Sequence, residues 1–135
     1  MILVDTSVLI NYLKGRSDDK TELFQEILSR DIPWGISPYV YQEILQGANN
    51  EREYEQLREY LCTQRMYFLP EKTETYEQAA RLYFDLRRKG ITPRGTIDIL
   101  IAITATRNNL YLLHNDKDFD VMAENAQDLR ILKTI

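Results

Sequence analysis

Four acidic residues of this sequence stand at positions that a solvated surface charge would not need: Asp5, Glu43, Asp98 and Asp116. Each lies at the end of an apolar run or beside an apolar helical stripe. Carboxylates that share one pocket repel one another, and a cation is needed to keep all of them ionised. Ligand sets made only of oxygen suit Mg²⁺ or Mn²⁺. Such a site can activate water and stabilise a leaving oxygen, so the chemistry we expect is hydrolysis of a phosphodiester bond.

The elements that must position these acids alternate between strands and helices. Short apolar runs predict five strands, at 2–4, 32–36, 66–69, 110–113 and 129–132. Apolar residues at helical spacing predict the helices between them, at 8–15, about 19–30, 38–48, 51–64, 73–90, 97–109 and 119–124. This alternation implies βαβ units, a parallel sheet and helices on both of its faces. We therefore expect one α/β domain that spans residues 1–135.

A parallel sheet explains why the acids should meet. Asp5 ends a buried strand, and Asp116 lies just beyond the strand at 110–113. If these strands are neighbours, both acids emerge at the same edge of the sheet, where open α/β sheets bind ligands. The first turn of the helix at 97–109 then brings Asp98 close to them.

Each acid also has an ordinary structural interpretation. Asp5 can be the N-cap of the helix that follows it, and Thr6 and Ser7 are two other good candidates. Glu43 can be a surface carboxylate of its helix. Asp98 can simply complement the dipole of its helix, which we expect Thr96 to cap. The joint placement of the four acids carries the hypothesis, because no single one of them does.

The polar segment HNDKDFD leaves two further points open. It holds both Asp116 and Asp118, and the sequence does not decide which of the two faces the site. It also holds His114, the single histidine of the chain, which we expect to be a loop or rim residue.

Composition excludes several other functions. The 135 residues carry a formal net charge of −4, which argues against a generic nucleic-acid coat protein but permits an enzyme whose basic residues lie on one face. Cys62 is the single cysteine, so a disulfide or a thiolate zinc cluster within the chain is excluded. The sequence has no apolar run of the roughly 20 residues that span a bilayer and no secretory signal pattern, so we expect a cytoplasmic protein without a membrane segment. Phosphate-binding glycine motifs are also absent.

Four motifs of the chain resemble those of PIN-domain ribonucleases, and in order and spacing they are most similar to the VapC toxins of VapBC toxin–antitoxin pairs. The motifs are VDTSVLI, QEILQGA, GTIDILIAITA and LLHNDKDFD. The resemblance implies a three-layer α/β/α sandwich with a central parallel sheet. It also implies a Mg²⁺- or Mn²⁺-dependent endoribonuclease that cleaves tRNA or rRNA, forms a homodimer and is neutralised by a cognate VapB-type antitoxin.

Carried over by position, the resemblance makes the four acids Asp5, Glu43, Asp98 and Asp116 the catalytic cluster. Asp5, Asp98 and Asp116 would bind the metal, and Glu43 and Asp116 would position the attacking water. Thr6 would support Asp5 or orient a water molecule.

The chain departs from the family pattern at His114, where Thr or Ser is usual. Arg94, just before the helix of Asp98, can contact a phosphate of RNA or a carboxylate of an antitoxin, or it can be a solvated loop charge. Two alternatives to the toxin hypothesis stay open at this point: a housekeeping RNA-processing nuclease of the same fold, and a non-catalytic α/β module that binds a partner and uses the acids only as caps.

Overall fold

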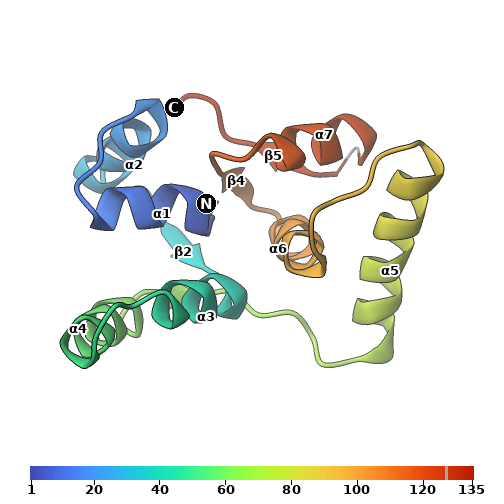
Figure 1. Cartoon of the computed structure of the whole chain (residues 1–135). Helices are drawn as coiled ribbons and strands as arrows, with labels where there is room; N and C mark the ends of the chain where they lie inside the picture. The colour runs from blue at the N-terminus through green and yellow to red at the C-terminus, as the bar shows by residue number, and fades with distance from the viewer. Residues whose placement is uncertain (127) are drawn as a thin grey trace.

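The computed structural model describes residues 1–126 and 128–135 and shows a five-stranded parallel sheet with helices on both faces (Figure 1). The order of the strands across the sheet is β3-β2-β1-β4-β5. The strands are β1 (Ile2–Val4), β2 (Trp34–Ile36), β3 (Arg65–Met66), β4 (Tyr111–Leu113) and β5 (Arg130–Ile131). The helices are α1 (Thr6–Leu13), α2 (Asp19–Ser29), α3 (Pro38–Gln46), α4 (Glu51–Leu61), α5 (Thr73–Arg88), α6 (Thr96–Arg107) and α7 (Lys117–Asn125).

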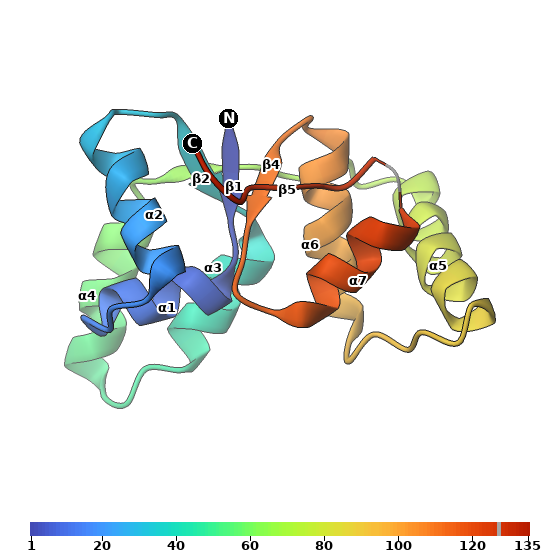
Figure 2. The same ribbon diagram turned by 90° about the horizontal axis from the view of Figure 1, so that it is seen from above.

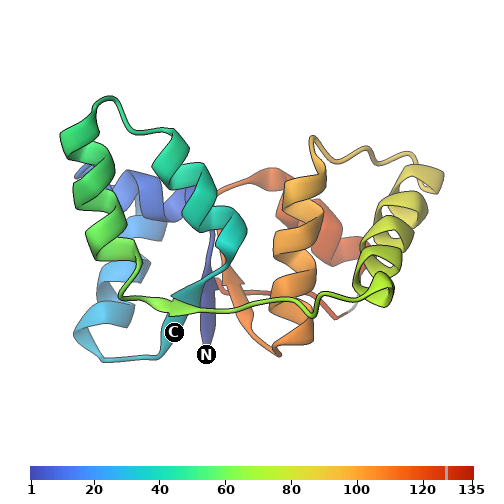
Figure 3. The same cartoon turned by 90° about the horizontal axis from the view of Figure 1, so that it is seen from below.

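The helices form two layers around the sheet. From above, α1, α2 and α7 lie in front of the strands (Figure 2). From below, α3, α4 and α6 lie in front, with α5 packed beyond α6 (Figure 3). This arrangement confirms the predicted three-layer α/β/α sandwich with a central parallel sheet. No helix in the described part of the chain has the length and apolar character needed to cross a membrane.

The centre of the sheet is the most buried part of the molecule, and it carries the site. The strands β1 and β4 pair in parallel, with Leu3 opposite Leu112, and both of these side chains are fully buried. The backbone N–H of Asp5 extends this pairing by donating to the carbonyl of Leu113 at 2.9 Å. The carboxyl ends of β1 and β4 therefore lie side by side, as the sequence predicts.

The helix α6 packs against this centre because it is apolar almost all round. Ile99, Ile101, Ala102 and Ile103 are all buried, so little freedom remains in how the helix is rotated. Its start differs from the prediction. Thr96 is already the first helical residue and Gly95 occupies the N-cap position, so no hydroxyl caps this helix.

The strand β3 is shorter than the predicted strand at 66–69. Among the described residues it pairs with β2 alone, and β2 ends at Ile36 because α3 begins two residues later. After Tyr67 donates to the carbonyl of Ile36 at 2.9 Å, the chain has no further strand beside it and leaves the sheet. Gly35 permits this close crossing, since a Cβ atom there would lie 2.6 Å from both the Arg65 carbonyl oxygen and the Tyr67 ring.

Candidate active site

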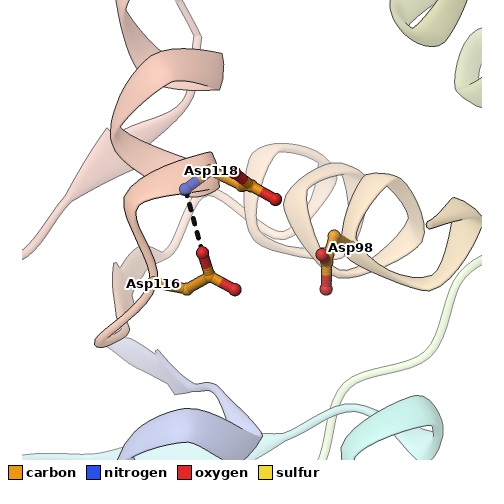
Figure 4. A group of neighbouring side chains, drawn as sticks. All are labelled: Asp98, Asp116 and Asp118. Atoms are coloured by element: carbon orange, nitrogen blue, oxygen red, sulfur yellow. Dashed lines mark hydrogen bonds between the residues drawn. The ribbon is translucent and has the colours of Figure 1, made fainter. Parts of the chain in front are cut away.

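Three carboxylates meet at the carboxyl edge of the sheet: those of Asp98, Asp116 and Asp118 (Figure 4). One oxygen from each lies within 4.8 Å of the others, and all three side chains are half-buried. Asp98 comes from the first turn of α6, Asp116 is the N-cap of α7, and Asp118 belongs to the first turn of α7. The sequence left open whether Asp116 or Asp118 faces the site, and the structure brings both into it.

The two oxygens of Asp116 have different tasks. Oδ1 accepts a hydrogen bond from the backbone N–H of Asp118 at 3.0 Å and so caps α7, while the other oxygen faces Asp98 (Figure 4). The cap also explains why α7 begins at Lys117 rather than at the predicted residue 119. The capping hydrogen bond therefore fixes the direction of the second oxygen. The Asp116 side chain both caps α7 and presents an oxygen to the site.

Asp5 repeats this arrangement at the end of β1. It is the N-cap of α1, which is one of the alternatives that the sequence left open, and neither Thr6 nor Ser7 takes this place. Asp5 Oδ2 accepts from the Ser7 backbone N–H at 3.1 Å and from the Ser7 hydroxyl at 2.6 Å. The same hydroxyl oxygen accepts from the backbone N–H of Asn115 at 2.9 Å. Ser7 thus links Asp5 to the segment between β4 and α7, a contact that sequence reasoning missed because it spans more than 100 residues.

Burial dominates the electrostatics of Asp5. The residue is 5 % exposed, and this burial raises the pKa of its carboxyl group, although the hydrogen bonds from Ser7 act in the opposite direction. Asp5 lies outside the group of three carboxylates that a single ion could contact directly in this geometry. Its charge nevertheless reaches Asp98, where it is the strongest of the neighbouring charges that raise the pKa.

Glu43 approaches the site from α3, on the side opposite to α7. Its Oε1 accepts a hydrogen bond from the Thr6 hydroxyl at 2.9 Å, across 37 residues of sequence. Burial raises the pKa of Glu43, and the charge of Asp5 adds to this effect, while the hydrogen bond from Thr6 lowers it. Glu43 is therefore a member of the acidic group and not a solvated surface carboxylate.

The pKa of Asp98 is affected by all of these neighbouring charges. Burial raises its pKa to about 6, with further contributions from Asp5, Asp116, Glu43 and Asp118 in that order. The charges of all four acids that the sequence singles out, and of Asp118, thus interact with one another. We call these five residues, Asp5, Glu43, Asp98, Asp116 and Asp118, the acidic field.

The donor set fits a hard divalent cation. All donors are carboxylate oxygens, and the buried Asp118 Oδ2 accepts no hydrogen bond from the described residues, its ion-pair partner being the exposed guanidinium of Arg94 at 3.4 Å. Two ligands on opposite sides of Mg²⁺, each about 2.1 Å from the ion, are about 4.2 Å apart, which is comparable with the spacing of the three oxygens here. A cation at this position would also remove the repulsion that raises the pKa of Asp98.

Two further residues border the cluster. Arg94 is 78 % exposed, and its Nε lies 3.4 Å from Asp118 Oδ2, so its charge faces the site. His114 lies in the loop between β4 and α7, as expected, but it is not an exposed rim residue, since it is only 2 % exposed. Burial lowers its pKa, so the ring is neutral at pH 7, and its Nδ1 accepts from the backbone N–H of Asp116 at 3.0 Å. Its burial has a physical reason: the ring packs against Phe119, with the ring centres 5.1 Å apart.

Comparison with known proteins places this site in a family. The PIN domain family matches residues 2–125. The ribonuclease VapC11 of Mycobacterium tuberculosis is 31% identical over 124 residues, which are 91% of this chain and 92% of that protein. The VapC ribonuclease Mb1587 of Mycobacterium bovis matches to the same extent.

Solved structures show the same fold. The VapBC-1 structure from nontypeable Haemophilus influenzae matches with a TM-score of 0.69 and 26% identity over 98% of both chains. The structure of VapBC2 from Rickettsia felis bound to a DNA fragment from their promoter matches with a TM-score of 0.73 and 21% identity, again over 98% of both chains. The sequence match, the shared fold and the acidic edge of the sheet agree, and this chain belongs to the PIN-domain family, within the group of the VapC ribonucleases.

Proposed function

We propose that this chain is a divalent-metal-dependent endoribonuclease and the toxin of a type II toxin–antitoxin pair. The observation that carries the proposal is the group of three carboxylates, Asp98, Asp116 and Asp118, inside a wider acidic field. The curated relatives are ribonucleases by name, which supports RNA as the substrate and makes the enzyme a hydrolase. Mg²⁺ or Mn²⁺ is the cation that an all-carboxylate site of this size favours.

The residues divide into three roles in this proposal. Asp98, Asp116 and Asp118 would hold the cation, and Asp5 would complete its surroundings from the end of β1. Bound there, the cation would supply Lewis-acid chemistry at a phosphate and lower the pKa of water. Glu43 would take the proton of the attacking water, because its raised pKa makes it a better base than an ordinary carboxylate. Thr6 would hold Glu43 in place through the hydrogen bond to Oε1.

Arg94 would contact the phosphate backbone of the RNA. Its guanidinium faces the acidic cluster and stays largely exposed, so it can reach a phosphate that approaches the site from solvent. A carboxylate of an inhibitory partner could use the same contact.

A VapB-type antitoxin and a second copy of this chain are the protein partners that we propose. Two of the similar structures are described as VapBC assemblies, and one of them holds DNA. This chain offers apolar surface for such partners: Tyr76, Phe84 and Ile97 are exposed on α5 and α6. A hollow of about 450 Å³ between these helices is lined mainly by apolar side chains.

One observation favours a non-catalytic binding module instead. Asp5 and Asp116 both cap helices, so their positions alone require no chemistry. Asp98 makes no capping hydrogen bond in α6, and burial and the neighbouring acids destabilise its charged form and so raise its pKa, which a purely structural role does not explain. A cation-binding role explains why Asp98 and Asp116 converge on one place together with Asp118.

Cleavage of cellular RNA by the purified protein tests the proposal. The protein is purified under denaturing conditions and refolded, so that any bound inhibitor is removed, and is then incubated with Mn²⁺ or with chelator. New 5′ ends are mapped by sequencing. We expect discrete cleavage sites that require Mn²⁺ and that disappear with Asp98→Asn.

The matched control is Asp31→Asn. Asp31 is exposed and precedes β2, at the opposite edge of the sheet, and asparagine tolerates its positive φ of 51°. The control should cleave at the wild-type rate. Cleavage by the Asp98→Asn protein at the wild-type rate, or wild-type cleavage in chelator, would overturn the proposed function.

A further inference from the structure

In the segment that joins β4 to α7, two backbone N–H groups donate hydrogen bonds to side chains. Asn115 and Asp116 lie between these two elements, where neither helix nor sheet supplies partners for their N–H groups. The N–H of Asn115 donates to the Ser7 hydroxyl at 2.9 Å, and the N–H of Asp116 donates to His114 Nδ1 at 3.0 Å. Because backbone N–H groups are strong donors that fold toward available acceptors, these two side chains help to determine the path of the segment.

We propose that His114 is a positioning residue that directs the Asp116 carboxylate toward the cation site, an inference that rests on the proposed function of the acidic cluster. The imidazole acts through the backbone of Asp116. Its Nδ1 fixes the N–H of Asp116, and the Asp118 N–H fixes Oδ1 of the same residue. With both ends of Asp116 held, the remaining oxygen points at Asp98 (Figure 4).

The surroundings of the ring make it suited to this task. His114 is 2 % exposed and packs against Phe119 of α7, which leaves the imidazole little freedom to rotate. An N–H donor to Nδ1 requires that this nitrogen carries no proton, so the neutral ring carries its proton on Nε2. Nε2 lies 3.2 Å from Oδ1 of Asp120, which is one turn further along α7 than Asp116. The hydrogen bond from Asp116 thus fixes the tautomer, and Nε2, which makes no hydrogen bond among the described residues, faces the Asp120 carboxylate.

The first experiment measures Mn²⁺ affinity by calorimetric titration of the wild-type, His114→Leu and His114→Asn proteins. Leucine fills the buried space but offers no acceptor. Asparagine keeps an acceptor, Oδ1, bonded to Cγ as Nδ1 is in histidine, and lacks the group that faces Asp120. We expect His114→Leu to weaken Mn²⁺ binding about 10-fold or more, and His114→Asn to restore it to within about threefold of wild type.

The possible results separate this inference from the proposed function. Equal Mn²⁺ affinity of the wild-type and leucine proteins, or an asparagine protein as weak as the leucine protein, would overturn the positioning role alone. A wild-type protein that binds no Mn²⁺ would overturn the metal site and this inference with it.

A second measurement uses the wild-type protein alone and so does not depend on how a substitution alters packing. Nitrogen-15 NMR of the metal-free wild-type protein reports which imidazole nitrogen is protonated. We expect the proton of His114 on Nε2, with Nδ1 coupled to the Asp116 amide across the hydrogen bond. A proton on Nδ1 would overturn the inference even if the leucine protein failed to fold.

Discussion

The ionised carboxylate of Asp98 should lower the stability of the folded protein when no metal is bound. Its pKa is raised to about 6 in the folded state, whereas the ordinary value is 3.8. The folded protein therefore binds a proton more tightly at this position than the unfolded chain does. Because the protonated form is the one that folding favours, the stability associated with Asp98 is fully present below about pH 4 and is lost as the pH rises through about 6. The Asp98→Asn protein, which has no charge to repel, should then be the more stable one at neutral pH.

The size of this effect follows from the shift. About two pKa units correspond to about 3 kcal/mol if the group is fully shielded. Asp98 is only half-buried, so solvent reduces both the desolvation penalty and the repulsion by the neighbouring acids, and we expect a gain of about 1 kcal/mol from Asp98→Asn. For a chain of this length that gain is a rise of about 3 to 5 °C in Tm.

Thermal unfolding in chelator, at about pH 7.5 and about pH 4, measures the effect. The Asp98→Asn protein should have the higher Tm at the higher pH, and most of this advantage should vanish at the lower pH. Addition of Mn²⁺ should reverse the order, because a cation that binds only the folded wild type adds about 2.7 kcal/mol at 100 times its Kd. The Asp31→Asn protein controls for the general effect of removing one negative charge.

Two results would refute this reasoning. If Asp98→Asn lowered the Tm in chelator at neutral pH, the carboxylate would be making a favourable interaction instead of suffering repulsion. If the gain were the same at both pH values, it would not come from the charge of Asp98.

Three other substitutions test separate parts of the structure. Thr6→Val removes the hydrogen bond that lowers the pKa of Glu43, so the acid limb of the pH–rate profile should move to higher pH; an unmoved limb would contradict the role of Glu43 as base. Arg94→Gln should raise KM for a model RNA while changing stability by less than about 0.5 kcal/mol, and an unchanged KM would argue against a phosphate contact. Gly35→Ala should cost about 2 kcal/mol in chemical unfolding, since the added Cβ meets a carbonyl oxygen at 2.6 Å, whereas Gly47→Ala, with no contact closer than 3.5 Å, should be nearly neutral.

Local patterns in the sequence predicted the elements at the centre of the fold. The apolar run Ile2–Val4, the acid that ends it and the helical spacing that follows all act between residues a few positions apart, so β1, Asp5 and α1 could be read directly. The same holds for α6, whose apolar character also predicted its burial. Alternation of such segments was enough to predict a parallel sheet with helices on both faces.

Tertiary structure decided where short elements begin and end. β3 stops early because β2, its single neighbour in the described sheet, stops early. α7 starts early because Asp116 turns its carboxylate back onto the N–H of Asp118. Neither event is visible in periodicity, because each depends on a partner or a side-chain direction and not on residue type.

The composition of the site divides in the same way. Sequence alone named Asp5, Glu43, Asp98 and Asp116, because acids at the ends or edges of apolar segments are conspicuous. It did not show that Asp118 joins the cluster or that His114 is buried beneath it. Nor did it show the contacts that tie the site together from distant parts of the chain, from Ser7 to Asn115 and from Thr6 to Glu43, which join residues 108 and 37 positions apart. Such pairs meet only after the strands have paired and the helices have packed, because the free energy that brings them together comes from burial of the core and not from the residues of the site.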